Sequence, residues 1–356
     1  MDQRWKKLGK LIVDYSTKVK PGEKVMIAMV EPETFPLAQA VYEAVVQAGG
    51  YPQIQLLSER LRRSLLLYGN EEQINRVPDI ELYGTEWADV YIGLRGAYNL
   101  HVLDDIPSDT LAKNQSAMGI VSTSRWQNTR WLIVRVPNEH FAHQAKSSYE
   151  EIEEMFFNSC FLDWEKELKT YQRWSKILEK GKEIRIVGNK TDLKFSVDGQ
   201  KWVPFAGVNN MPDGEVATAP IVETIDGTIY FENPGVLSGR LIHGITLTWE
   251  NGVLVEATSD TEQEFFQSIV HKDAGSSLIG EFAFGTNYGV TRFTNDILVD
   301  EKIGGTIHIA LGRAYPECGG TNESAIHWDI IKDIRKEGYV TLDGKVIIKD
   351  GKILID

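Results

Sequence analysis

The chain has 356 residues, 42% hydrophobic and 25% charged, which is typical of a folded globular protein with room for two domains of about 100–200 residues. Its net charge of −13 argues against nucleic acid or an anionic membrane as partner, because both attract basic surfaces. The two cysteines form no CxxC pair and favour a reducing, cytoplasmic location. The sequence contains no run of about 18 apolar residues, so we expect no membrane span.

The first 145 residues alternate between strand and helix patterns. A helix closed by glycines is expected at 36–50. The expected strands are 24–30, 51–57, the end of 86–96, and 130–137. Strands that alternate with helices predict a largely parallel, doubly wound sheet, and hence an α/β N-terminal domain over 1–145. The segment contains neither a GxGxxG fingerprint nor a phosphate loop, so we expect no nucleotide site in it.

The pattern changes twice more along the chain. Residues 146–180 carry apolar side chains at helical spacing and are expected to form a helical connector. From 181 to 356, short strand patterns alternate with glycine-rich turns, and Asn251-Gly252 predicts a two-residue hairpin. We therefore expect a β-rich (α+β) domain over 181–356, and its sequence also contains the candidate metal ligands.

The stretch "AIHWDII" holds two ionisable residues in an otherwise apolar strand pattern. Alternation along a strand places His327 and Asp329 on one face. Burying two such groups without partners is costly, so they need either solvent or a shared partner. Taken alone, an exposed His–Asp hydrogen bond is the simpler interpretation.

Three further residues stand in similar settings. His308 lies in the strand pattern "GGTIHIALG", and Glu215 and Glu281 each follow a glycine and precede small or apolar residues. Imidazoles and carboxylates without thiolates suit a divalent ion such as Zn, Co, Mn or Fe. The combined set exceeds the needs of one tetrahedral ion and could hold two, which would lower the pKa of a bound water. Tyr315 could reach the same site as a ligand or as an oxyanion donor.

The motifs "GEVATAP", "GEFAFGTN", "TIHIALGRAYPECGG" and "NESAIHWD" resemble those of the aminopeptidase T/aminopeptidase S family of thermophilic metalloproteases. The resemblance covers about residues 180–335, with a weaker α/β match before them. It implies a homodimer, with an α/β N-terminal domain and a β-rich catalytic domain, that releases N-terminal residues from peptides by a metal-activated water. It also implies a dinuclear Zn, Co or Mn site, in which Glu281 serves as general base or bridging ligand and Tyr315 has a catalytic role. The implied ligands are Glu215, Glu281, His308, Tyr315, His327 and Asp329.

The same fold also resembles a ring-cleaving dioxygenase of dihydroxypyridine that uses a single Fe(II). In such an enzyme His308, His327 and Asp329 would form a triad of two histidines and one carboxylate. The presence of both Glu215 and Glu281 favours the dinuclear hydrolase.

Overall fold

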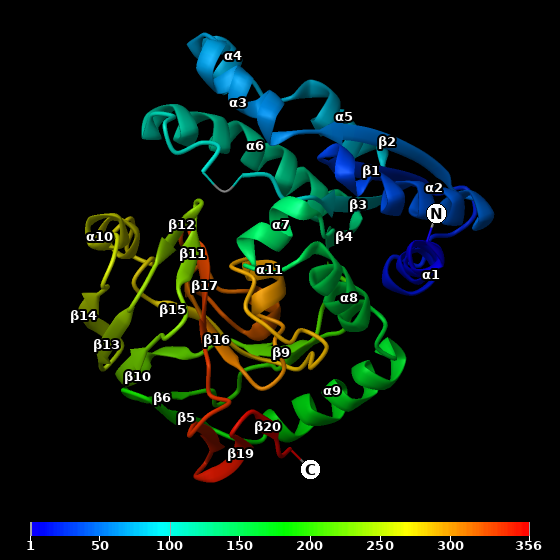
Figure 1. Ribbon diagram of the computed structural model, residues 1–356. Coiled ribbons are helices and arrows are strands. Elements are labelled where there is room, and N and C mark those ends of the chain that lie inside the picture. The colour runs from blue at the N-terminus through cyan, green and yellow to red at the C-terminus, as the bar shows by residue number, and fades with distance from the viewer. Residues whose placement is uncertain (1, 100, 356) are drawn as a thin grey trace. The chain divides into compact units, whose positions relative to one another are not determined.

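The computed structural model describes residues 2–99 and 101–355 (Figure 1). The chain divides into two compact units, and each is described by itself. The first comprises Met1–Phe161 and Gly207–Pro212, and the second comprises Leu162–Ala206 and Asp213–Asp356. Among the described residues, no helix combines the length and the apolar character needed to cross a membrane.

The first unit is built on one five-stranded sheet in which every neighbouring pair of strands is parallel. In spatial order its strands are β2 (Tyr51–Leu57), β1 (Lys24–Val30), β3 (Val90–Arg95), β4 (Arg130–Arg135) and β8 (Asn210–Met211). The expected parallel sheet is thus confirmed. Strand β8 was not expected, because two residues are too short to leave a pattern and they come from far along the chain.

Helices connect these strands and cover the sheet (Figure 1). They are α1 (Gln3–Leu11), α2 (Phe35–Gln47), α3 (Glu59–Tyr68), α4 (Glu71–Asn75), α5 (Asp79–Trp87), α6 (Ser108–Asn128), α7 (Glu139–Gln144) and α8 (Tyr149–Cys160). Helices α2, α5 and α6 all contact strands of the sheet. With both faces covered, β1 becomes a nearly continuous buried apolar run rather than an alternating one.

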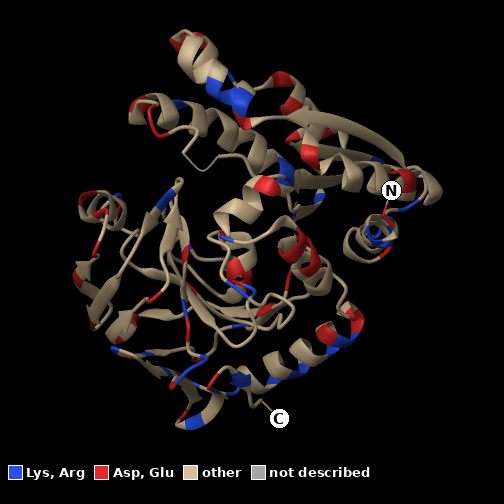
Figure 2. Cartoon of the chain, viewed as in Figure 1, with Lys and Arg blue, Asp and Glu red and all other residues tan. Residues whose placement is uncertain are grey.

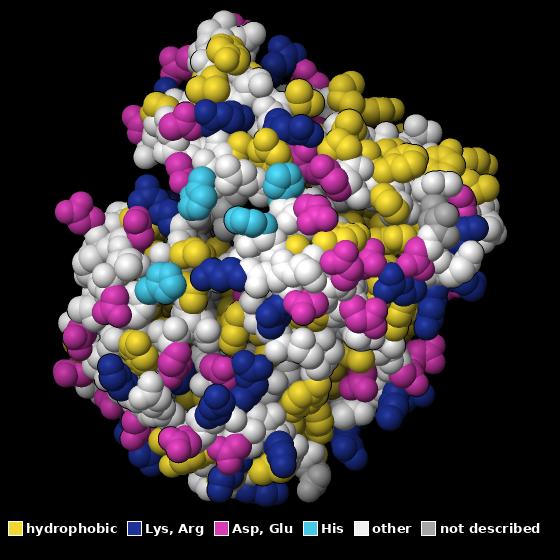
Figure 3. Space-filling model, in the orientation of Figure 1, with side chains coloured by type: hydrophobic (Ala, Val, Ile, Leu, Met, Phe, Trp, Pro, Cys, Tyr) yellow, Lys and Arg dark blue, Asp and Glu magenta, His cyan; other side chains and the backbone are white. Residues whose placement is uncertain are grey.

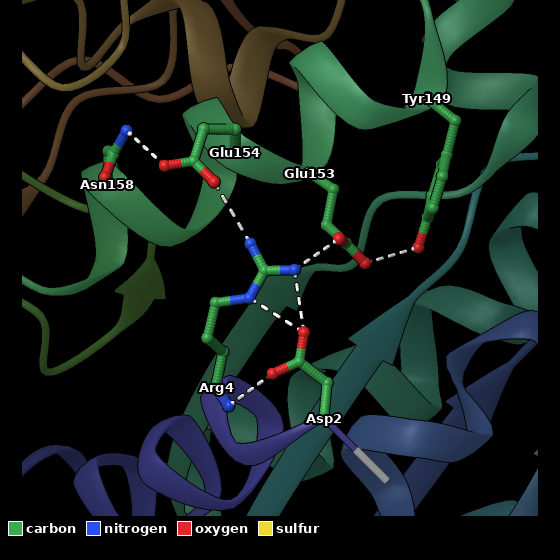
Figure 4. Close-up of polar contacts among 6 residues, drawn as sticks. All are labelled: Asp2, Arg4, Tyr149, Glu153, Glu154 and Asn158. Carbon is green, nitrogen blue, oxygen red and sulfur yellow. Dashed lines mark hydrogen bonds and ion pairs between the residues drawn. The ribbon is translucent and has the colours of Figure 1, made fainter.

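Helix α1 contacts α8 through an aromatic pair and through a charge network, and Figure 4 shows the charge network. The rings of Trp5 and Phe157 lie 4.7 Å apart between centroids. Beside them, the Arg4 guanidinium lies 2.7 Å from Glu153 Oε2 and 3.1 Å from Glu154 Oε2. The N-terminal helix is therefore anchored by apolar packing, with the ion pairs at its edge adding a smaller share.

The segment expected as one helical connector, 146–180, is interrupted. Helix α8 ends at Cys160 in the first unit, and α9 (Trp164–Leu178) begins in the second. The interruption has a local cause, because the Asp163 side chain accepts a hydrogen bond from the backbone N–H of Lys166 at 3.1 Å and so caps a new helix. Acidic and basic side chains are interspersed along the solvent-facing side of α9 (Figure 2).

The second unit contains two larger antiparallel sheets. The eight-stranded sheet has, in spatial order, β14 (Val253–Thr258), β13 (Thr246–Glu250), β10 (Ile221–Tyr230), β6 (Thr191–Ser196), β5 (Glu183–Gly188), β18 (Tyr339–Leu342), β19 (Lys345–Lys349) and β20 (Lys352–Ile353). The predicted hairpin joins β13 to β14, with Asn251 at φ 49° and Gly252 at φ 81°. These sheets confirm the expected β-rich second part.

The five-stranded sheet carries the candidate residues. Its strands are, in order, β17 (His327–Lys332), β16 (Ile307–Gly312), β15 (Ile279–Gly285), β9 (Glu215–Thr218) and β7 (Val203–Phe205). Smaller elements complete the unit, namely the pair β11 (Gly235–Leu237) and β12 (Arg240–Ile242), and helices α10 (Gln263–Val270) and α11 (Ile297–Asp300).

One face of the five-stranded sheet is apolar and forms the core. Phe282 of β15 lies 5.3 Å from Phe195 of β6 and 6.0 Å from Trp202, measured between ring centroids. Ile309 and Ile330 pair across β16 and β17 on the same face. Because a one-residue slip would expose this face, its burial sets the register of every strand in the sheet.

Candidate metal centre

The strand register brings three candidate residues together at one end of the sheet. Glu281 on β15 and Asp329 on β17 both lie opposite Ala310 of β16, and His327 lies opposite Gly312. Since residues directly opposite one another share a face, these three side chains project from the face opposite the apolar core.

The other two candidates join the same face from the neighbouring pairs. His308 lies opposite Ala283, and Glu215 lies opposite Gly285. Ala217, next but one to Glu215 along β9, also lies opposite Ala283. The positions between the polar side chains are therefore alanine or glycine, which leaves room above the sheet.

A β-bulge adjusts the position of Glu281. The pairing of β15 with β16 shifts register between Ile279 and Glu281, at Gly280. A side chain at Gly280 would put its Cβ 2.3 Å from the carbonyl oxygen of Gly312, so only glycine fits. Bulges of this kind turn a neighbouring side chain relative to the regular ladder.

The imidazole nitrogens face carboxylate oxygens at close range. His327 Nε2 lies 3.3 Å from Glu281 Oε2 and 3.4 Å from Asp329 Oδ1. His308 Nε2 lies 3.5 Å from Glu215 Oε2 and 4.0 Å from Glu281 Oε1. These contacts join Glu215, His308, Glu281, His327 and Asp329 in one continuous series.

Local charge governs the protonation of these groups. Burial alone would lower the pKa of His327, but the attraction and hydrogen bonding of Asp329 raise it well above the usual value. Burial opposes ionisation of Asp329, yet the His327 cation lowers the pKa of that carboxyl to about 2. His308 differs, because burial dominates there and lowers its pKa, which favours the neutral imidazole that can ligate a metal.

Two overlapping groups among the described residues have the geometry of a cation site. In the His327 group (Glu281, His327, Asp329) and in the His308 group (Glu301, His308, Asp329), one ligand atom from each residue lies within 4.8 Å of the others. Asp329 belongs to both groups, as a carboxylate bridging two cations would.

Three charged residues at this site were not predicted from the sequence, namely Asp213, Glu301 and Lys302. Lys302 is fully buried, and its Nζ lies 2.7 Å from Glu215 Oε1, 2.7 Å from Glu301 Oε1 and 3.6 Å from Asp213 Oδ1. Burial would lower the pKa of Lys302, but these carboxylates raise it well above its usual value, so it stays a cation. Glu301 and Lys302 lie in the run "VDEKIGG", whose composition resembles a solvated turn. The one feature of the sequence that could have indicated their role is the position of this run just before the strand of His308.

The loop after β15 holds these segments in place. The buried Asn287 side chain donates to the carbonyl oxygen of Asp213 at 2.7 Å, and its backbone N–H donates to the carbonyl oxygen of Lys302 at 2.9 Å. Asn287 therefore links the segment before Glu215 to the segment that carries Glu301.

These residues fit a divalent cation. Two imidazoles and several carboxylates, without thiolates, are the donors preferred by borderline divalent metals. Among the described residues, Glu215 Oε2 is buried without a hydrogen-bond partner and faces His308. A buried carboxylate oxygen of this kind calls for a cation or a donor.

Tyr315 borders the candidate ligands. Its ring lies 4.7 Å from the ring of His327, measured between centroids. Burial, and then the negative charges of Glu281 and Asp329, raise the pKa of Tyr315, so the phenol stays protonated and able to donate.

Comparison with known proteins identifies the family. Residues 1–352 match the thermophilic metalloprotease family M29. Aminopeptidase 2 of Geobacillus stearothermophilus is 30% identical over 178 residues, a match that spans 42% of this chain and 42% of that protein. Aminopeptidase PepS of Streptococcus thermophilus is 22% identical over 380 residues, spanning 91% of each.

Two solved structures share the fold. Wild-type AmpT from Thermus thermophilus superposes with a TM-score of 0.89 at 20% identity, covering 99% of each chain. A 2,5-dihydroxypyridine dioxygenase from Pseudomonas putida KT2440 superposes with a TM-score of 0.63 at 13% identity, covering 100% of this chain and 98% of the other. The chain belongs to the thermophilic metalloprotease family M29, because the family match extends over nearly its whole length.

Proposed function

We propose that this M29 member is an aminopeptidase that releases N-terminal residues from peptides with the aid of two divalent ions, Zn, Co or Mn. The observation that carries the proposal is the sharing of Asp329 by the His327 group and the His308 group. In hydrolytic sites, paired divalent ions activate a water and polarise the substrate carbonyl.

The proposed ligands are those expected from the sequence, except that Glu301 is added and Tyr315 is given the role of a hydrogen-bond donor instead. They are Glu215, Glu281, Glu301, His308, His327 and Asp329, and Tyr315 stands beside them. His327 is oriented for this role by its Nδ1, which lies 2.7 Å from the carbonyl oxygen of Arg313.

We assign the proton-transfer role to Glu281, which can serve as general base or as a bridging ligand. Its carboxylate lies between the two histidines, within 4.0 Å of both Nε2 atoms. A general base must reach the proton that it removes, and this central place on the face suits that task. Tyr315 would donate a hydrogen bond to the oxyanion that forms on the scissile carbonyl.

The mononuclear iron alternative has less support. Each described group combines one imidazole with two carboxylates, whereas the iron triad needs two imidazoles and one carboxylate. The resemblance to the dioxygenase structure, at 13% identity, concerns the fold alone.

Two further parts of the proposal concern assembly and location. We propose a homodimer, as the family resemblance implies. Large apolar side chains stay exposed along edge strand β2 and around α2, where Figure 3 shows apolar surface gathered, and such surface suits a protein contact. We also propose a cytoplasmic location, which the two free cysteines, Cys160 and Cys318, support.

The proposal is tested by metal analysis and peptide hydrolysis on the same preparation. We expect about two equivalents of Zn, Co or Mn per chain, and release of free amino acid from short peptides and aminoacyl anilides. Chelation should abolish the release, and metal addition should restore it. Hydrolysis that resists chelation, or none after loading with all three metals, would refute the function. Oxygen uptake by the Fe(II)-loaded protein with dihydroxylated rings would favour the alternative.

A further inference from the structure

The two metal positions proposed above differ in their distance from the ammonium of Lys302, a positive charge that cannot act as a metal ligand. Lys302 Nζ lies 2.7 Å from Glu301 Oε1, and Glu301 belongs to the His308 group. The same ammonium lies 2.7 Å from Glu215 Oε1, while the other oxygen of Glu215 faces His308 at 3.5 Å. Lys302 therefore forms ion pairs with two carboxylates, Glu215 and Glu301, that lie next to His308.

The carboxylates of the His327 group face no such ammonium within the part of the chain that the structure describes. Glu281 and Asp329 pair with histidine nitrogens, and no lysine or arginine nitrogen lies within 4.0 Å of either carboxylate among the described residues. A dication that enters the His327 group has to displace only a proton, and the imidazole of His327 becomes a ligand once that proton has left Nε2. A dication that enters the His308 group must share Glu301, and Glu215 beside it, with the ammonium of Lys302.

Lys302 cannot easily withdraw from the site. Its side chain is fully buried, and a third carboxylate, Asp213, lies 3.6 Å from Nζ. An ammonium enclosed in this way keeps its charge close to any metal ion on that side, where weak screening strengthens repulsion between like charges.

We propose that Lys302 is an internal cation that ranks the two metal positions, so that the His327 group loads first and the His308 group loads second and more weakly. The inference rests on the proposed dinuclear function and deepens it. Without metal, the ammonium offsets part of the negative charge of Glu215 and Glu301, and a second ion must compete with it for both carboxylates.

The test is a calorimetric titration of the metal-free full-length protein with Zn²⁺, in wild type and in Lys302→Gln. In wild type we expect two binding steps, the second weaker by about tenfold or more. In Lys302→Gln the second step should tighten by about tenfold or more, because the competing charge is gone. The metal-free variant should melt at a lower temperature than wild type, and Zn²⁺ should raise its melting temperature by a larger amount, since metal replaces the lost cation.

Two control variants separate charge from other effects. Lys302→Arg keeps the positive charge, so its two Zn²⁺-binding steps should still differ in affinity as they do in wild type. Lys332→Gln removes another fully buried lysine, which pairs with Glu232 at 2.6 Å on the opposite face of β17, and should leave both steps unchanged.

The outcomes distinguish the inference from the function. If wild type and Lys302→Gln both bind no Zn²⁺, the proposed function fails. If both bind two ions with the same two affinities, the role of Lys302 alone is overturned. Should Lys302→Gln be recoverable only with Zn²⁺ present, the wild-type titration still decides, because equal affinity of its two steps would contradict the ranking.

Discussion

The Nδ1 atom of His327 lies 2.7 Å from the carbonyl oxygen of Arg313, which leaves Nε2 to face Glu281 and Asp329. A carbonyl can only accept, so Nδ1 carries the hydrogen in this contact and the tautomer is set. Arg313 follows directly after β16, so the neighbouring strand orients the ring.

Replacing His327 by alanine should remove a ligand and cost one of the two bound ions. We expect kcat/KM to fall by about hundredfold or more, since even residues that only orient a metal ligand contribute 10–100-fold. Metal content and hydrolysis of an aminoacyl anilide measure both effects. His243→Ala, at an exposed histidine outside the site, is the matched control and should behave as wild type. Full metal content in His327→Ala would show that His327 is not a metal ligand.

Glu281→Gln keeps the shape of the side chain but removes its ability to accept a proton. We expect kcat to fall by about 10²–10⁴-fold, the usual contribution of a general base. Parallel metal analysis separates the two possible roles, because loss of an ion would identify a bridging ligand and retention of both would identify the base. Glu317→Gln removes an exposed carboxylate nearby and should leave kcat unchanged.

Tyr315→Phe should retain the ring contact with His327 and lose only the hydroxyl. If the phenol stabilises the oxyanion, kcat should fall by about 10²–10³-fold with metal content unchanged. Steady-state kinetics with metal analysis provides the measurement. A variant that loses metal would instead identify Tyr315 as a ligand, and unchanged kcat with full metal content would exclude both roles.

Metal affinity should rise with pH through the neutral range. The pKa of His327 is raised, so the metal-free site holds a proton there that a cation must displace. Affinity should therefore increase by up to tenfold per pH unit below that raised pKa and level off above it. Titration calorimetry with Zn²⁺ in buffers of different ionisation enthalpy counts the released protons. Zero release at pH 7 would contradict the assignment.

Asp273 supports the segment that leads into β17. Its carboxylate accepts hydrogen bonds from the backbone N–H of Ala325 at 2.8 Å, from Ser324 Oγ at 2.8 Å and from the N–H of Gly275 at 3.0 Å. The hydrogen bond from Ala325 and the others lower the pKa of Asp273 in the folded protein. Its stabilisation is therefore complete above the unfolded pKa of about 3.9 and disappears as the pH falls through the lower folded value.

Asp273→Asn should accordingly lower the free energy of unfolding by about 1 kcal/mol at pH 7, and by progressively less below pH ~4. Urea denaturation of both proteins from pH 7 to pH 3 measures the difference. A difference that is independent of pH would show that the charge of Asp273 contributes nothing.

Much of the second unit follows from local patterns. Alternation along a strand is enough to place His327 beside Asp329, and the Asn251-Gly252 turn is enough to predict its hairpin, because both depend on neighbouring residues. The connector shows the limit of such patterns, since helical spacing continues past Cys160 while the capping side chain of Asp163 starts a separate helix.

The sequence by itself determined the types of residue that could bind a metal and the faces of their own strands that carry them. Only the tertiary structure decided which of these faces meet, because strand register depends on burying Phe282, Ile309 and Ile330 far along the chain. Only the tertiary structure revealed Glu301 and the buried Lys302, because the charged segment in which they lie resembles a surface turn. An ammonium stays buried only where enough carboxylates surround it, and those around Lys302 come together through long-range folding.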